Sequence, residues 1–192
     1  MTDPLMMSTC CPPDSGEVVP VIRCAGRWFN EIRPDTAMAE TVAGFIRRRF
    51  LHAYGAEPSL RIPALLALTT AQGTLLAAVG VRNAALEKLF LEDYLSVSVE
   101  SVMPVAGVER HRIAEIAHLA GVEAGVSRFL FASLSVWLDG AGYDWVVCTG
   151  TDQLRNSLSA LRSAGLLRLI QPVESEAAGS EAMAGGSYGH IA

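Results

Sequence analysis

Residues 113–139 read IAEIAHLAGVEAGVSRFLFASLSVWLD, an apolar stretch that changes character at two glycines. Residues 113–119 alternate in the way that is typical of a β-strand. Over residues 126–139 an apolar residue recurs at every fourth position, which places these residues on one face of a helix. Gly121 and Gly125 lie between the two patterns. The stretch therefore predicts a strand, a glycine-containing turn and a helix in succession.

The following residues repeat this alternation. Residues 144–148 read DWVVC and predict a buried strand. A helix is expected over residues 153–164, where Gly165 ends it before a last strand at 166–171. Strands joined by helical crossovers pair in parallel. The C-terminal half therefore predicts a β-α-β-α-β arrangement.

The N-terminal half predicts antiparallel strands and one long helix. The expected elements are a strand at 18–23 that contains Pro20, a helix from Pro34 to Gly55, and a hairpin of strands 64–70 and 74–82. The segment 90–95 reads FLEDYL and leaves its type open, and 96–103 predicts a short helix before Pro104. Hairpin strands followed by parallel crossovers indicate an α/β fold, with a mixed central sheet that is flanked by helices on both faces.

The composition fits one domain. The chain has 192 residues, of which 51% are hydrophobic and 18% charged, enough apolar material for one core. We expect a flexible arm at 1–16, a single domain at 17–173 and a flexible tail at 174–192. The longest apolar run, 129–138, is too short to span a bilayer, and the N-terminus lacks the pattern of a signal peptide. We therefore expect a cytoplasmic protein with no membrane partner.

Charge and cysteine content exclude two further classes of partner. The net charge is −5, and no basic stripe interleaved with aromatic residues is present, so we expect no nucleic-acid partner. The four cysteines are Cys10, Cys11, Cys24 and Cys148. They show no CxxC spacing and form no standard zinc pattern with the histidines, which predicts free thiols and no metal site.

The order of elements and the glycine turn resemble the GNAT superfamily, whose acyl-CoA pyrophosphate loop has the pattern Q/R-x-x-G-x-G/A. Gly125 matches the first glycine and Ser127 the small residue, whereas Val122 stands where Gln or Arg is usual. A closer resemblance, over about residues 45–170, is to the thermostable hemolysin family. Its matching blocks are LFLEDYL (89–95), RIAEIAHLA (112–120), DWVVCTGTDQLRNSL (144–158) and the glycine-ended stretch 161–166.

The resemblance implies an N-acyltransferase that forms an amide between a thioester-bound acyl group and the amine of a small molecule, in a biosynthetic pathway. The donor would be an acyl-CoA or the phosphopantetheine of an acyl carrier protein, with no tightly bound cofactor. Two alternatives stay open: a non-catalytic GNAT-like module that binds acyl thioesters, and a membrane-lytic factor. Both a monomer and a homodimer are compatible with the sequence.

Amide formation needs a base, a donor for the oxyanion and an exit for the thiolate. Glu115 is the first candidate for the base, with a structural role as the partner of an arginine such as Arg112 or Arg155 as the alternative, and His118 is the second. The two share a strand face only if a bulge separates them. The backbone N–H of Leu119 or Ala120 is expected to face the oxyanion. The residues expected to bind the donor are Leu119, Gly121, Gly125, Val126, Ser127, Arg128 and Asn156.

Four further residues are expected at the substrate: Glu92, Tyr94, Arg155 and Arg162. Tyr94 has a core aromatic as its alternative, and Asn156 faces either a cleft or water. The run Arg47–Arg49 is interpreted either as a solvated helix face or as a patch for an acidic carrier protein.

Overall fold

The computed structural model describes residues 16–55, 58, 64–122, 125–151 and 188–191. The helix expected at 153–164 and the strand expected at 166–171 lie outside the described residues. The chain divides into two compact units. The first comprises Met1–Val81 with His118–Leu134, and the second comprises Arg82–Ala117 with Ser135–Ala192. Each unit has its own cluster of buried apolar side chains.

Four strands run antiparallel to one another in chain order. They are β1 (Val18–Cys24), β2 (Arg27–Ile32), β3 (Ala64–Thr70) and β4 (Leu75–Asn83). The strand at 18–23 and the hairpin are confirmed. Ala25 and Gly26, with φ of 48° and 76°, make the two-residue turn from β1 to β2, because hairpin turns of this kind need positive φ at both positions.

Strand β2 was not predicted. Its sequence, RWFNEI, places polar Asn30 at a position that the structure buries to 2% exposure. The Asn30 amide donates to Thr69 Oγ1 on β3 at 3.1 Å, and this bond offsets the cost of burying it. The side chain that satisfies the buried Asn30 amide, Thr69, is therefore 39 residues away in the chain.

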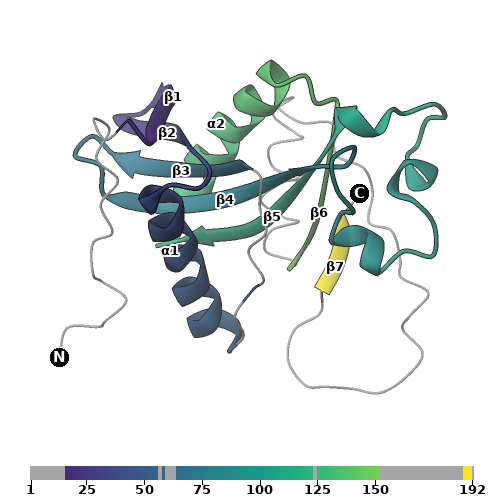
Figure 1. Ribbon diagram of the computed structural model, residues 1–192, viewed down its shortest axis with the longest axis horizontal. Helices are drawn as coiled ribbons and strands as arrows, with labels where there is room; N and C mark the ends of the chain where they lie inside the picture. Colours follow the sequence, from purple (N-terminus) through teal and green to yellow (C-terminus); the bar gives the residue numbers. More distant parts are fainter. Residues whose placement is uncertain (1–15, 56–57, 59–63, 123–124, 152–187, 192) are drawn as a thin grey trace. The chain divides into compact units, whose positions relative to one another are not determined.

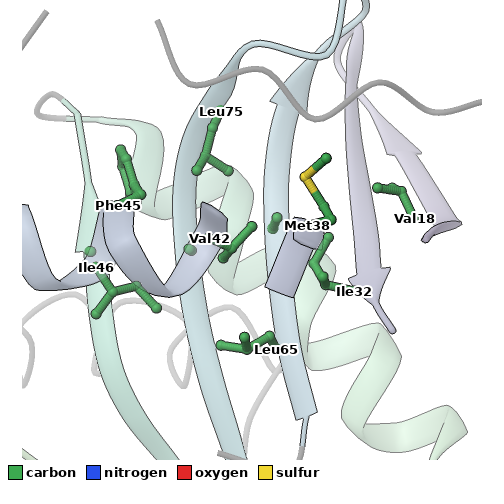
Figure 2. Packing of buried hydrophobic residues seen from close by; sticks show 11 residues of the cluster. Val18, Ile32, Met38, Val42, Phe45, Ile46, Leu65 and Leu75 are labelled. Atoms are coloured by element: carbon green, nitrogen blue, oxygen red, sulfur yellow. The ribbon is translucent and has the colours of Figure 1, made fainter. Parts of the chain in front are cut away.

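Helix α1 (Ala37–Tyr54) confirms the expected helix. Thr36 caps its N-terminus by accepting a hydrogen bond from the Ala39 N–H at 3.2 Å, and left-handed Gly55 ends it at a φ of 66°. Figure 2 shows its apolar side chains over the strands of the first unit. The labelled members of this cluster are Val18, Ile32, Met38, Val42, Phe45, Ile46, Leu65 and Leu75.

The crossover unit is also confirmed. Strand β5 (Ile113–Gly121) leads into helix α2 (Val126–Gly140) and then β6 (Trp145–Thr151), with Ile113 pairing in parallel with Trp145. Three short 3-10 helices precede it: η3 (Leu91–Asp93), η4 (Val99–Val102) and η5 (Arg110–Arg112). The short helix expected within 96–103 is thus present as η4.

Strand β7 (Tyr188–Ile191) pairs antiparallel with β6. The sequence placed these residues in a flexible tail, and for them that prediction was wrong. The segment YGHI is too short, and its glycine too unfavourable in a strand, for the sequence alone to predict pairing.

The sheet is mixed, and its strand order is β1-β2-β3-β4-β5-β6-β7 (Figure 1). In β2, Ile32 packs in the cluster of α1, whereas Arg27, of opposite parity, reaches the Phe129 ring of α2. Since alternate strand residues face opposite sides, the two helices cover opposite faces of β2. The expected α/β class is confirmed. Neither helix in the described part of the chain has the length and hydropathy needed to cross a membrane.

Candidate functional site

Strand β5 is irregular at His118. Its φ of 54° lies in the left-handed region, where residues other than glycine seldom occur. A left-handed residue interrupts the strict alternation of side chains along a strand, as β-bulges do. Glu115 and His118 can share a face of the strand only if the alternation of side chains is broken, as the sequence indicated. Such a break is present at His118. By contacts, however, Glu115 belongs to the second unit and His118 to the first.

The His118 side chain lies against an aromatic residue of α1. Its ring centroid is 5.7 Å from that of Phe50, and the Phe50 centroid is 5.3 Å from that of Tyr54. His118 is half-buried and Tyr54 is 50% exposed, so the row of rings runs from β5 to the surface of the first unit. The imidazole therefore packs against Phe50 in a half-buried position, and its Nδ1 has almost no exposed surface.

Beyond β5 the chain turns into α2 through the glycines that the sequence indicated. Gly125 has a φ of 88°, and a Cβ there would meet no atom within 4 Å, so glycine is required by the backbone conformation. Val126 opens α2 and is buried, whereas Ser127 is half-buried. In β5, Leu119 is half-buried and Ala120 is 4% exposed.

Two arginines approach one ring at the first turn of α2. The Arg128 guanidinium lies 4.9 Å from the Phe129 centroid, and that of Arg27 lies 4.3 Å from the same centroid. Arg128 is exposed, so its predicted contact with a phosphate remains sterically open. Arg27 was not among the predicted residues, because nothing near it in the sequence points to α2.

Arg49 was also missed. Within the basic run Arg47–Arg49, Arg49 is not simply exposed to solvent. Its guanidinium donates hydrogen bonds to the carbonyls of Gly121 and Val122, where β5 ends. Arg47 fits the solvated interpretation better, as its only described ion pair is a 3.6 Å contact with Glu40. Arg49 lies three residues after Ile46 and seven after Val42, on the buried face of α1. This helical spacing is the sequence signal that could have distinguished it from Arg47.

Glu115 is 1% exposed and belongs to the second unit. Its two carboxylate oxygens accept hydrogen bonds from the backbone N–H groups of Phe90 at 2.8 Å and Leu91 at 2.7 Å. Burial raises the pKa of the Glu115 carboxyl, against these hydrogen bonds and the charge of Arg82, which lower it. The carboxylate thus holds the start of η3. This is a structural role, although the expected arginine is not its hydrogen-bond partner.

The arginine suggested as that partner, Arg112, instead binds Asp144 with both Nε and Nη2, the latter at 2.9 Å. The alternative suggestion, Arg155, lies outside the described residues, as do Asn156 and Arg162. Their predicted contacts with the donor and the substrate stay predictions.

Glu92 and Tyr94 have different surroundings. Glu92 receives two nitrogens of Arg110, at 2.7 and 3.0 Å, and Arg110 also donates to Glu100 at 2.6 Å. The Arg110 hydrogen bonds lower the pKa of Glu92 to about 2. Glu92 also accepts from the backbone N–H groups of Leu89 and Val99, so it ties together the loop that contains η3 and η4. Tyr94 is 57% exposed, so its alternative as a core aromatic was wrong.

Comparisons with known proteins agree with this architecture. The family model described as thermostable hemolysin matches residues 32–190. No curated protein matches the sequence. Among solved structures, TofI in an apo form is similar with a TM-score of 0.55 and 11% identity, over 85% of this chain and 87% of that one.

The catalytic domain of Tetrahymena GCN5 histone acetyltransferase, in complex with coenzyme A, is similar with a TM-score of 0.51 and 10% identity, over 88% of this chain and 94% of that one. At these identities the likeness shows the fold alone. The chain therefore shares its fold with TofI and with this histone acetyltransferase domain.

Proposed function

The chain belongs to the thermostable hemolysin family, and from this premise we propose that it is an N-acyltransferase, which transfers an acyl group from a CoA or carrier-protein thioester to the amine of a small molecule. The observation that carries the proposal is the end of β5: left-handed His118, followed by the turn through Gly125 into α2. An irregular strand that runs into a helix N-terminus brings backbone donors to the place where a thioester carbonyl and a phosphate would bind.

His118 supports the base role better than Glu115 does. Imidazole is a common general base, and the ring of half-buried His118 lies against Phe50. Both oxygens of Glu115, by contrast, are engaged by backbone N–H groups, and the residue is 1% exposed. In the proposed reaction His118 removes a proton from the attacking amine, and the N–H of Leu119 or Ala120 stabilises the oxyanion. Collapse of the tetrahedral intermediate breaks the C–S bond, and the departing thiolate takes the proton back from the His118 imidazolium.

The donor side of the proposal uses the first turn of α2. The partial positive charge of a helix N-terminus attracts phosphate, and Gly125 lets the main chain approach it closely. Arg128 and Arg27, both beside the Phe129 ring, add positive charge in the first unit. These groups would compensate for Val122, which stands where related loops have Gln or Arg.

The test is isothermal calorimetry of the protein with CoA, acetyl-CoA and an acyl-loaded carrier protein. Gly125→Val is compared with Gly142→Val, since both glycines have similar φ (88° and 84°) and a Cβ at either position would meet open space. The two variants carry the same kind of backbone strain at different places. Binding that Gly125→Val abolishes and Gly142→Val retains would support the proposal, whereas the absence of binding to any donor would refute it.

A second candidate is a module that binds the thioester without turnover. The engagement of Glu115 favours it, because the acid nearest the centre of β5 has a structural role. The module would bind a donor in the calorimeter but release no free thiol from acetyl-CoA in the presence of any amine in a screen. Thiol release that depends on an amine would exclude it.

A further inference from the structure

The peptide group that joins Gly121 to Val122 is held from both sides. On one side, the Val122 N–H donates to the Leu76 carbonyl of β4 at 2.9 Å. On the other, Arg49 Nε donates to the Gly121 carbonyl at 2.8 Å, and Nη2 donates to the same oxygen. In a trans peptide the N–H and the C=O point in opposite directions, so two partners at opposite ends prevent the plane from rotating.

The same guanidinium reaches the next carbonyl along the chain, because Arg49 Nη2 donates to Val122 O at 2.7 Å. A planar guanidinium presents several N–H groups in a fixed geometry, and a charged donor makes stronger bonds than a neutral one. Two successive carbonyls are therefore oriented by one side chain, which comes from α1, 72 residues earlier.

We infer that Arg49 is a positioning residue, which fixes the direction in which the chain leaves β5 towards Gly125 and α2. This inference rests on the proposed function, because the segment so directed is the one assigned to the thioester donor. Arg49 acts through the backbone and not by contact with the reacting atoms. It adds to the proposal that the peptide groups at the end of β5 are oriented before the donor arrives, and a preorganised site loses less entropy on binding.

The neighbouring Arg47 provides a matched control. It lies on the same helix two residues earlier, and its side chain is 39% exposed with a 3.6 Å contact to Glu40. Replacing either arginine by methionine removes one positive charge and leaves a side chain of high helix propensity. A general effect of charge would appear in both variants, whereas an effect of position would appear in Arg49→Met alone.

The experiment measures two quantities on Arg49→Met, Arg49→Lys and Arg47→Met: amide hydrogen exchange at Val122 and the affinity for CoA by calorimetry. In Arg49→Met we expect exchange at Val122 to become at least about tenfold faster and the Kd for CoA to rise about tenfold, because three charge-assisted hydrogen bonds, from two nitrogens, are lost. Arg49→Lys should restore part of both, since an ammonium can still reach a carbonyl. Arg47→Met should match the unaltered protein.

The outcomes separate this inference from the proposed function. Unchanged exchange at Val122 in Arg49→Met would overturn the inference. Faster exchange with an unchanged Kd would also overturn it, while leaving the donor site in place. If the unaltered protein binds neither CoA nor an acyl-loaded carrier protein, the proposed function fails and the inference fails with it. If Arg49→Met does not fold, Arg49→Lys decides, because a Kd equal to that of the unaltered protein would overturn the inference.

Discussion

The Glu115 carboxylate accepts a hydrogen bond of 2.7 Å from the backbone N–H of Leu91, and its second oxygen is engaged in the same way by Phe90. An acid inside a strand is usually interpreted as catalytic, since burial of a charge is costly. Here the two N–H groups at the start of η3 satisfy it. The same contact explains why the segment FLEDYL has its 3-10 turn at this place.

Glu115→Gln is expected to lower the free energy of unfolding by about 1–3 kcal/mol near pH 4, because an amide NH2 replaces an oxygen that faces a backbone donor. Burial raises the folded-state pKa of Glu115 above its unfolded value. The stability that it contributes is therefore full below the unfolded pKa and is lost as the pH rises through the folded pKa, so the difference should shrink at higher pH. Urea titrations at several pH values check this. Glu109→Gln, an exposed neighbour, is the control, and lost turnover with unchanged stability would contradict the structural role.

Glu92 should have the opposite pH dependence. Hydrogen bonds from Arg110 lower its pKa to about 2, so its contribution is present above the unfolded pKa and is lost as the pH falls from about 4.5 through about 2. Glu92→Gln should cost about 2–3 kcal/mol at pH 7 and almost nothing at pH 2. Thermal unfolding of the two proteins across this range measures the difference. A constant difference at all pH values would show that the ion pair with Arg110 does not form.

Two substitutions at His118 distinguish the effect of its backbone conformation on stability from its proposed role as the base. Asparagine accepts a left-handed φ and valine does not, so His118→Val should lower the melting temperature and His118→Asn should change it little. In an assay of amine-dependent thiol release, His118→Asn should lower the rate by about 10²–10⁴-fold, because the base is gone. Folded His118→Asn protein with full activity would exclude His118 as the base.

The cysteines provide a test of burial. Cys148 is 1% exposed, and burial raises the pKa of its thiol to about 12, whereas Cys24 is half-buried. At pH 8, iodoacetamide should modify Cys24 within the time in which Cys148 remains unmodified, since the thiolate is the reactive form. Peptide mass spectrometry reports each site, and in denaturant both should react alike. Equal rates in the native protein would contradict the described packing of β6.

Local pattern was sufficient for most elements of the fold. The helix face of α1, the glycine at its end and the strand β5 are each readable within a few residues, and all three are confirmed, although Ile113 to Ala117 are all buried and do not alternate. Strand β2 was missed because Asn30 breaks its apolar pattern. A buried amide is acceptable only when a distant partner such as Thr69 is in place, and the sequence does not show which residues pair.

The candidate site was predictable only in part. The turn through Gly125 was found because glycine marks positive φ. The left-handed conformation of His118 was not, since a histidine, unlike a glycine, does not by itself indicate a positive φ. Glu92 was placed at the substrate, whereas its carboxylate binds Arg110 and two backbone N–H groups.

The sequence by itself determined the α/β class, the order of the strands and helices that it predicted, and the position of the glycine turn, because periodicity and backbone propensity are local properties. Tertiary structure alone decided which charged residues are structural. Glu115 meets the N–H groups of η3, and Arg49 reaches the end of β5 from a helix 72 residues away. Hydrogen bonds between such distant groups depend on how the elements pack. Helical spacing can place a charged residue on a buried face, as it does for Arg49, but the sequence does not show which distant group it will bind.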